Sequence, residues 1–197
     1  MKKFVLAPAL AALAVAAASL ASFCSAHAQT ATYTLDPTHT FVTWEALHFG
    51  TSTSRGRFDK KEGKVEIDRA AKTGKVDITI DMASITTGVA PFDNHLKGKD
   101  FFDVTTHPTA RFQASGFSFD GTKVSAVQGT LTMLGKTQPV ELQASRFNCY
   151  DNPFFKREVC GGDFEVTIQR SQWGSTSGLP AIPDNIRLLV QVEAIKQ

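Results

Sequence analysis

Neither sign of charge predominates in this sequence once its first residues are set aside. The chain of 197 residues holds 21 Lys and Arg against 19 Asp and Glu, and removing Lys2 and Lys3 leaves 19 against 19. A neutral protein lacks the basic surface by which proteins bind nucleic acid or acidic membranes. The composition therefore argues against nucleic acid as a partner. The length suits one domain that can bury a core or enclose a cavity.

Long apolar runs are missing except at the N-terminus. An uncharged, Ala-rich stretch spans residues 4–20, and residues 26–28 supply the small-x-small pattern that signal peptidase recognises. A retained membrane anchor is the alternative, because the stretch is about long enough to span a bilayer, but no positive stop-transfer residues follow it. We expect residues 1–28 to be a cleaved secretory signal peptide and residues 29–197 to form one periplasmic domain.

Cysteine is scarce, with three in the whole chain. Cys24 lies in the leader after Phe23, which is not the small residue that normally precedes a lipid-modified cysteine. Cys149 and Cys160 remain as an even pair in a compartment where disulfides persist, and turn residues fill the segment between them. We predict that they form a disulfide that closes a hairpin. A thiol-redox site is the alternative, but the spacing is far from Cys-x-x-Cys.

Patterns that carry catalysis or metal binding are also missing. No nucleophile-elbow pattern surrounds Ser54 or Ser171, and Asp100 and Asp103 lie near lysines, where we expect capping and solvated charges. With the cysteines oxidised, zinc has few ligands left. No two histidines of the mature chain have the i, i+2 or i, i+4 spacing that aims two rings at one metal: His39, His48, His95 and His107. We therefore expect no enzyme, no metal site and no cofactor.

The two-residue alternation of β-strands is what the mature sequence has in abundance. Apolar and polar residues alternate in segment after segment, and turn signals such as Asp120-Gly121 and Leu134-Gly135 separate them. Roughly eight antiparallel strands would close a barrel that holds one ligand, although a β-sandwich fits the alternation nearly as well. In a barrel the predicted cavity lining is Val42, Trp44, Phe58, Phe112, Leu131, Met133, Leu142, Phe164, Ile168, Leu188 and Val190.

The alternation stops between Met82 and His107. Residues 93–97 could form a short helix, and a long insertion in a compact β-domain is usually functional or covers an opening. Two interpretations stay open for the large side chains gathered there. They either plug the end of the core or form a mobile lid over a ligand mouth: Phe92, His95, Leu96, Phe101 and Phe102.

Four segments, in order along the mature chain, are similar to one protein family. Residues 95–104, HLKGKDFFDV, with the Pro and Phe after them, resemble the pattern HL-x-x-x-x-FFDV-x-x-x-P-x-x-x-F. Residues 36–58 resemble opening strands in which a His and a Gly precede an Arg-Gly-Arg-Phe turn. Residues 130–142 resemble a hairpin ending in Lys-Pro-Val, and residues 168–174 resemble an Arg-x-x-Phe-Gly element. Together they resemble the YceI-like polyisoprenoid-binding proteins.

The resemblance implies a lipocalin-like, extended antiparallel β-barrel with a short helical insertion. It also implies a binding protein whose ligand is an isoprenoid or another long-chain lipid, and quinone carriage is one natural role. We expect transient contact with a membrane that donates or accepts the lipid. Trp173 stands where Phe is commoner, which puts the ligand rather than the fold in question. The competing hypothesis is a solid β-sandwich whose loops bind a protein partner. The oligomeric state stays open, a homodimer included.

Overall fold

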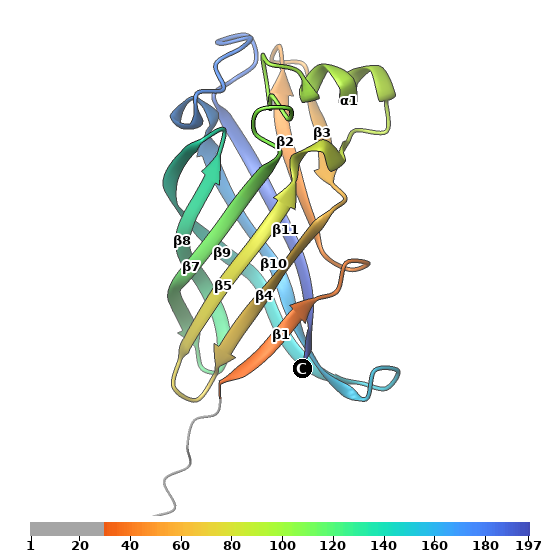
Figure 1. Ribbon diagram of the computed structural model, residues 1–197. Coiled ribbons are helices and arrows are strands. Elements are labelled where there is room, and N and C mark those ends of the chain that lie inside the picture. The colour runs from red at the N-terminus through yellow and green to blue at the C-terminus, as the bar shows by residue number, and fades with distance from the viewer. Residues whose placement is uncertain (1–29) are drawn as a thin grey trace, which may run out of the picture.

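Eleven β-strands, each antiparallel to its neighbours, make up most of residues 30–197, the part of the chain that the computed structural model describes (Figure 1). The predicted leader, residues 1–28, lies outside the described residues. The strands are β1 (Ala31–Leu35), β2 (Phe41–His48), β3 (Ser52–Phe58), β4 (Lys61–Asp68), β5 (Thr73–Asp81), β6 (Ile85–Thr86), β7 (Thr109–Asp120), β8 (Lys123–Met133), β9 (Lys136–Asn152), β10 (Arg157–Gln169) and β11 (Asn185–Lys196).

Eight of these strands form a closed ring in the order β1-β4-β5-β7-β8-β9-β10-β11, and the ring closes where β1 pairs with β11. One edge of β11 pairs with β10, and its other edge is shared, because residues 194–196 pair with β1 whereas residues 187–191 pair with β2. β2 then continues the sheet to β3 and β6 at one end of the barrel. The ring confirms the predicted all-β barrel, and a two-sheet sandwich is wrong.

Turn chemistry places the hairpins where the sequence predicts them. Leu134 and Gly135 both have positive φ, 51° and 71°, and link the paired residues Met133 and Lys136. This is the backbone of a two-residue turn whose twist matches that of antiparallel strands. Gly121, with φ of 60°, lies in the turn between β7 and β8. These tight turns keep consecutive strands adjacent around the ring.

The pairing register shifts at three places in the barrel, and two of these shifts precede an inward-facing phenylalanine. The pairing register shifts in β7 after Ala114 and in β9 after Ala144. An extra residue in one strand sends the next inward side chain one position further along. Phe117 and Phe147 therefore reach the interior although each lies three residues after the preceding apolar alanine. A strict two-residue pattern misses both.

The segment without alternation folds over one end of the barrel (Figure 1). It contains η1 (Met82–Ser84), the short strand β6 and α1 (Ala90–Lys97). The predicted helix is confirmed, and it begins earlier than expected, where Pro91 occupies its first turn. The chain then turns back, and the N–H of Phe102 donates to the carbonyl of Leu96 at 3.1 Å. This places Phe101 and Phe102 against the cavity, at the end of the barrel where α1 lies.

The β9–β10 hairpin projects from the opposite end of the barrel (Figure 1). Cys149 and Cys160 are direct partners in the register of the two strands, and their sulfurs form a disulfide. The predicted covalent link at the hairpin is therefore confirmed. Because it joins the two strands before they leave the barrel, it fixes the base of the projecting tip, residues 150–157.

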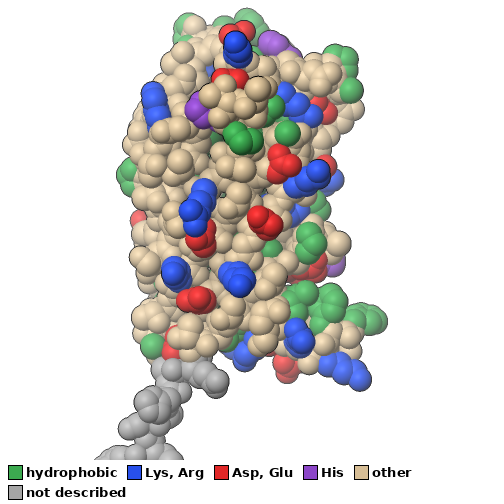
Figure 2. Space-filling model, in the orientation of Figure 1, with side chains coloured by type: hydrophobic (Ala, Val, Ile, Leu, Met, Phe, Trp, Pro, Cys, Tyr) green, Lys and Arg blue, Asp and Glu red, His purple; other side chains and the backbone are tan. Residues whose placement is uncertain are grey.

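Ion pairs decorate the outer wall of the barrel. Arg187 contacts the carboxylates of Glu45 and Glu165, one on each neighbouring strand, and Arg111 pairs with Asp77. Figure 2 shows charged side chains of both signs spread over the wall. Exposed pairs of this kind add little stability each, so the interior has to hold the fold together.

Candidate functional site

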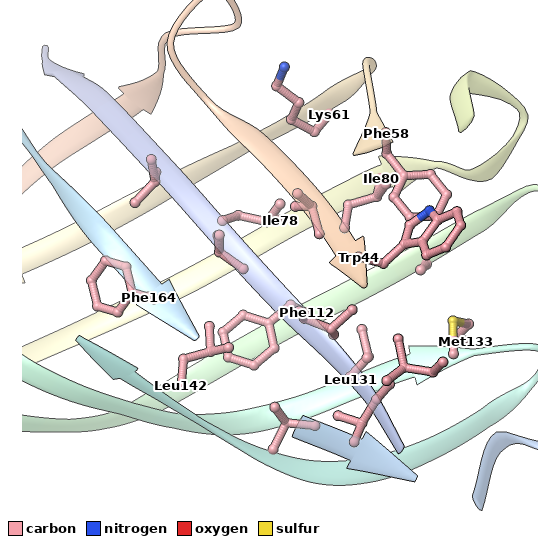
Figure 3. A pocket seen from close by; sticks show the side chains of 18 of the residues that line it. Trp44, Phe58, Lys61, Ile78, Ile80, Phe112, Leu131, Met133, Leu142 and Phe164 are labelled. Atoms are coloured by element: carbon pink, nitrogen blue, oxygen red, sulfur yellow. The ribbon is translucent and has the colours of Figure 1, made fainter. Parts of the chain in front are cut away.

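The barrel encloses a cavity of about 500 Å³. Side chains from every strand of the ring reach it, and nearly all are aliphatic or aromatic (Figure 3). Pockets of this order of size can bury most of a small ligand. The interior is thus hollow and apolar rather than filled.

The structure places all eleven side chains of the predicted lining at the cavity wall: Val42, Trp44, Phe58, Phe112, Leu131, Met133, Leu142, Phe164, Ile168, Leu188 and Val190. β11 illustrates why the alternation of apolar and polar residues predicted the lining. Leu188 and Val190 face inward, whereas Leu189 between them is not among the lining residues. Contact between these side chains and a lipid stays a prediction.

The large side chains of the insertion lie at the same cavity. The five predicted plug or lid residues line it: Phe92, His95, Leu96, Phe101 and Phe102. Two edge-to-face aromatic pairs join the insertion to the barrel strands. The ring centroids of Trp44 and Phe92 are 6.5 Å apart, and those of Phe58 and Phe102 are 5.6 Å apart. The insertion therefore forms the cavity's wall at the α1 end, and its mobility stays a prediction.

The cavity is open at the α1 end and closed at the other. Three of its lining residues are exposed, Leu47, His48 and His95, and all three lie in β2 or α1 at that end. At the opposite end the wall is formed by buried side chains such as Tyr33 and Phe147, which are 2% and 8% exposed. A ligand would therefore enter between the β2–β3 turn and α1.

The two Lys and Arg side chains at the cavity wall have partners within the protein. The guanidinium of buried Arg170 donates to the carbonyls of Ser175, Ile182 and Pro183 at 3.0 to 3.1 Å. The Nζ of Lys61 donates to the carbonyls of Pro37 and Asp59. Burial lowers the pKa of Lys61. Among residues 30–197, Trp44 Nε1 is the one buried side-chain donor or acceptor without a partner.

A hydrogen-bonded cluster seals the closed end. The hydroxyl of Tyr33 donates to Glu158 at 2.6 Å, and Arg69 and Lys196 also contact this carboxylate. Burial, followed by the bond to Glu158, raises the pKa of Tyr33. Burial also acts to raise the pKa of Glu158, but the Tyr33 bond and the positive charge of Arg69 outweigh it and lower that pKa overall. Tyr33 stays neutral and Glu158 stays charged at neutral pH.

Sequence reasoning missed several residues of the cavity wall. Tyr33 lies in a five-residue strand among threonines, and Lys61 puts a charged residue on the inward face of β4. Phe117 and Phe147 follow bulges. The signal for β1 and β4 is therefore the alternation of Tyr33 with Leu35 and of Val65 with Ile67, which is too short to stand out.

In the part of the chain that the structure describes, one group of side chains is close enough together to bind a metal ion. Cys149, Glu158 and Cys160 lie close enough to share an ion, but both sulfurs are used in the disulfide. The hydroxyl of Ser171 donates to Asp184 at 2.6 Å.

No helix among residues 30–197 has the length and apolar character needed to cross a bilayer.

The family model of the YceI-like domain matches residues 33–194. The chain belongs to the YceI-like family. Among curated relatives, a UPF0312 protein of Pseudomonas aeruginosa is 31% identical over 188 residues, covering 94% of this chain and 97% of the relative. One of Pseudomonas putida is 32% identical over 190 residues, covering 95% and 96%.

Solved structures share the YceI-like barrel. The Campylobacter jejuni YCEI protein superposes with a TM-score of 0.63 at 28% identity, covering 74% of this chain and 86% of that one. BcnA of Burkholderia cenocepacia gives 0.66 at 24% identity, covering 81% and 98%. A polyisoprenoid binding domain from Saccharophagus degradans gives 0.61 at 16% identity, covering 84% and 98%. The last two likenesses establish the fold alone.

Proposed function

We propose that this YceI-like protein holds one long-chain isoprenoid, or a related lipid such as a quinone, inside its barrel. The observation that carries the proposal is a hollow interior of about 500 Å³ with an apolar wall. Charged groups at that wall are bonded to backbone carbonyls. Such a wall offers contact area to an apolar chain and few groups to a charged one. The polyisoprenoid binding of the Saccharophagus degradans domain supports the same ligand class.

The energetics suit a carrier. Each methylene removed from water contributes about 0.8 kcal/mol, so ten would contribute about 8 kcal/mol before ordering costs. A membrane offers the same chain nearly the same environment. Transfer between membrane and barrel is therefore close to neutral, which lets the protein both load and release its ligand.

The same features favour binding over catalysis. Three titratable residues of the cavity wall, Lys61, Arg170 and Tyr33, are held by internal hydrogen bonds. None of them is arranged as a nucleophile and base. The leader pattern of residues 1–28 and the Cys149–Cys160 disulfide support a periplasmic location. Loading then requires transient contact with a membrane.

Native mass spectrometry of protein purified from its own host tests the proposal. We expect a mass excess equal to one apolar molecule per barrel, which organic extraction then identifies. The same spectrum reads the oligomeric state, where a homodimer is one expectation. A barrel that consistently purifies without any apolar ligand would favour the alternative, a module whose loops bind a protein partner.

A further inference from the structure

The large hydrophobic side chains that are exposed among residues 30–197 all lie at the two ends of the barrel. Three lie on or beside the projecting hairpin tip: Tyr150, Phe154 and Phe155. Four lie at the α1 end, with exposed fractions of 44%, 63%, 55% and 37%: Leu47, Phe49, Val89 and Leu179. Figure 2 shows hydrophobic side chains along the upper edge and on the hairpin. Clustered exposed apolar side chains mark interaction surfaces.

The four residues at the α1 end belong to three segments around the cavity opening, residues 46–54, 85–92 and 174–183, which we name the mouth rim. Each segment carries exposed apolar side chains and also contributes to the cavity wall. The wall residues are Ala46, Leu47, His48 and Ser54 from the first segment, Phe92 from the second, and Ser175 and Ile182 from the third. The exposed apolar surface is therefore continuous with the cavity.

Backbone contacts hold parts of the mouth rim together. The N–H of Phe49 donates to the carbonyl of Ala181 at 3.2 Å, which joins the first segment to the third. The second segment contacts β2 two residues before the first segment begins, through the edge-to-face pair of Phe92 with Trp44. The rim is thus one surface built from distant parts of the chain.

Charge separates the mouth rim from the rest of the molecule. Its 27 residues include no Lys, Arg, Asp or Glu, in a chain of which 20% is charged. The hairpin tip, by contrast, carries Asp151, Lys156 and Arg157. Moving a charged group toward hydrocarbon is costly, whereas apolar, hydroxyl and glycine positions can enter the interfacial region of a bilayer without that cost.

We propose that the mouth rim docks on the surface of a lipid bilayer, with the cavity opening toward the membrane while the lipid enters or leaves. The inference rests on the proposed function, because only a protein that exchanges lipid needs a dry path between cavity and membrane. Attraction to anionic lipid is not required, since the rim has no charge to offer it. The docking is therefore insensitive to salt.

The test compares two matched double variants of the full chain. Phe49→Asp with Leu179→Asp adds two charges to the mouth rim without altering a cavity-wall residue, and Phe154→Asp with Phe155→Asp does the same at the hairpin tip. Flotation with neutral phosphatidylcholine vesicles, and with vesicles that also contain phosphatidylglycerol, measures docking. Movement of a long-chain polyprenol from donor to acceptor vesicles measures exchange, and thermal unfolding verifies that both variants fold.

We expect the rim variant to lose about tenfold in vesicle affinity, equivalent to about 1.4 kcal/mol, and to slow polyprenol transfer to a similar degree. The tip variant should match wild type in both vesicle types and at high salt. A rim variant that floats like wild type would overturn the proposal. So would a loss confined to the tip variant, or binding that needs phosphatidylglycerol and disappears with salt. Capture of a protein partner by the rim without flotation would also overturn it. The flotation vesicles contain no polyprenol, so flotation measures membrane docking independently of lipid binding in the barrel. The docking result therefore stands even if extraction finds no lipid in the barrel.

Discussion

The two ends of the barrel are built on opposite principles. The end near Tyr33 is closed by buried side chains, a carboxylate with three polar partners, and a disulfide between adjacent strands. The α1 end is open, and the three segments of the mouth rim contain no Lys, Arg, Asp or Glu. The difference suggests a division of labour, in which one end holds the ring together and the other admits the ligand. Changes at the closed end should affect stability, and changes at the wall or the open end should affect the lipid.

The wall between the two ends should give the largest effect. In Leu188→Glu an unpaired carboxylate would face the apolar cavity, which is costly next to a bound hydrocarbon chain. We expect lipid retention to be abolished, as read by organic extraction and mass spectrometry. Folding should suffer less than in a filled core, because the cavity can admit water around the charge.

Leu189→Glu is the matched control, one residue along the same strand and outside the cavity lining. It should leave the lipid content unchanged. Equal lipid loss in both variants would mean that the cavity is not the binding site.

The disulfide gives the next largest effect, and at the closed end it should be one of stability alone. Replacing Cys149 and Cys160 by Ser should lower the free energy of unfolding by about 3 kcal/mol, measured by denaturant unfolding without reductant. The amount of lipid per folded barrel should stay the same. A large loss of lipid from folded protein would contradict the separation between the two ends.

Gly56 lies against the ring of Trp44, a cavity-wall residue, and a substitution there should disturb the wall. A Cβ at Gly56 would lie 2.6 Å from the Trp44 ring, which covers this glycine from the neighbouring strand. Gly56→Ala should therefore cost about 1–3 kcal/mol and push the indole into the cavity, with reduced lipid content. In a Trp44→Leu background the same change should cost less in a double-mutant cycle. Equal costs in both backgrounds would show that the ring is not the obstacle.

The smallest expected effect is the acid sensitivity of the closed end. The pKa of Glu158 is lowered in the folded state, so its contribution to stability is present above the unfolded pKa of about 4.3 and is lost as pH falls through the lower folded value. Glu158→Gln should lower stability at neutral pH by about 1–2 kcal/mol and flatten this acid dependence. Urea unfolding at a series of pH values measures it, and an unchanged pH profile would argue against the cluster.

The wall of the barrel could be predicted from the sequence more completely than its two ends. The wall was predictable because inward and outward side chains alternate along each strand, and residues such as Phe112, Leu131 and Leu188 follow that rule. The turn residues Leu134-Gly135 predicted a hairpin, and both have positive φ in the structure. The barrel, rather than the sandwich, depends on the pairing of β1 with β11, a contact between distant segments that no local pattern encodes.

The ends were less predictable because they break the alternation. Phe117 and Phe147 follow bulges, whose position depends on the opposite strand, and Lys61 is buried on an inward face. The opening of the cavity depends on where α1 and the β2–β3 turn meet in space. The absence of charge from residues 46–54, 85–92 and 174–183 was visible in the sequence, but only the fold brings these segments to one end.

Electron density within the barrel of protein crystallised from its native host tests the central claim most directly. We predict one continuous, extended density that begins under α1, passes Trp44 and Phe112, and ends near Tyr33. Its outline should match the apolar molecule that extraction identifies. A cavity that contains only ordered water, or one filled by its own side chains, would contradict the claim that this barrel carries a lipid.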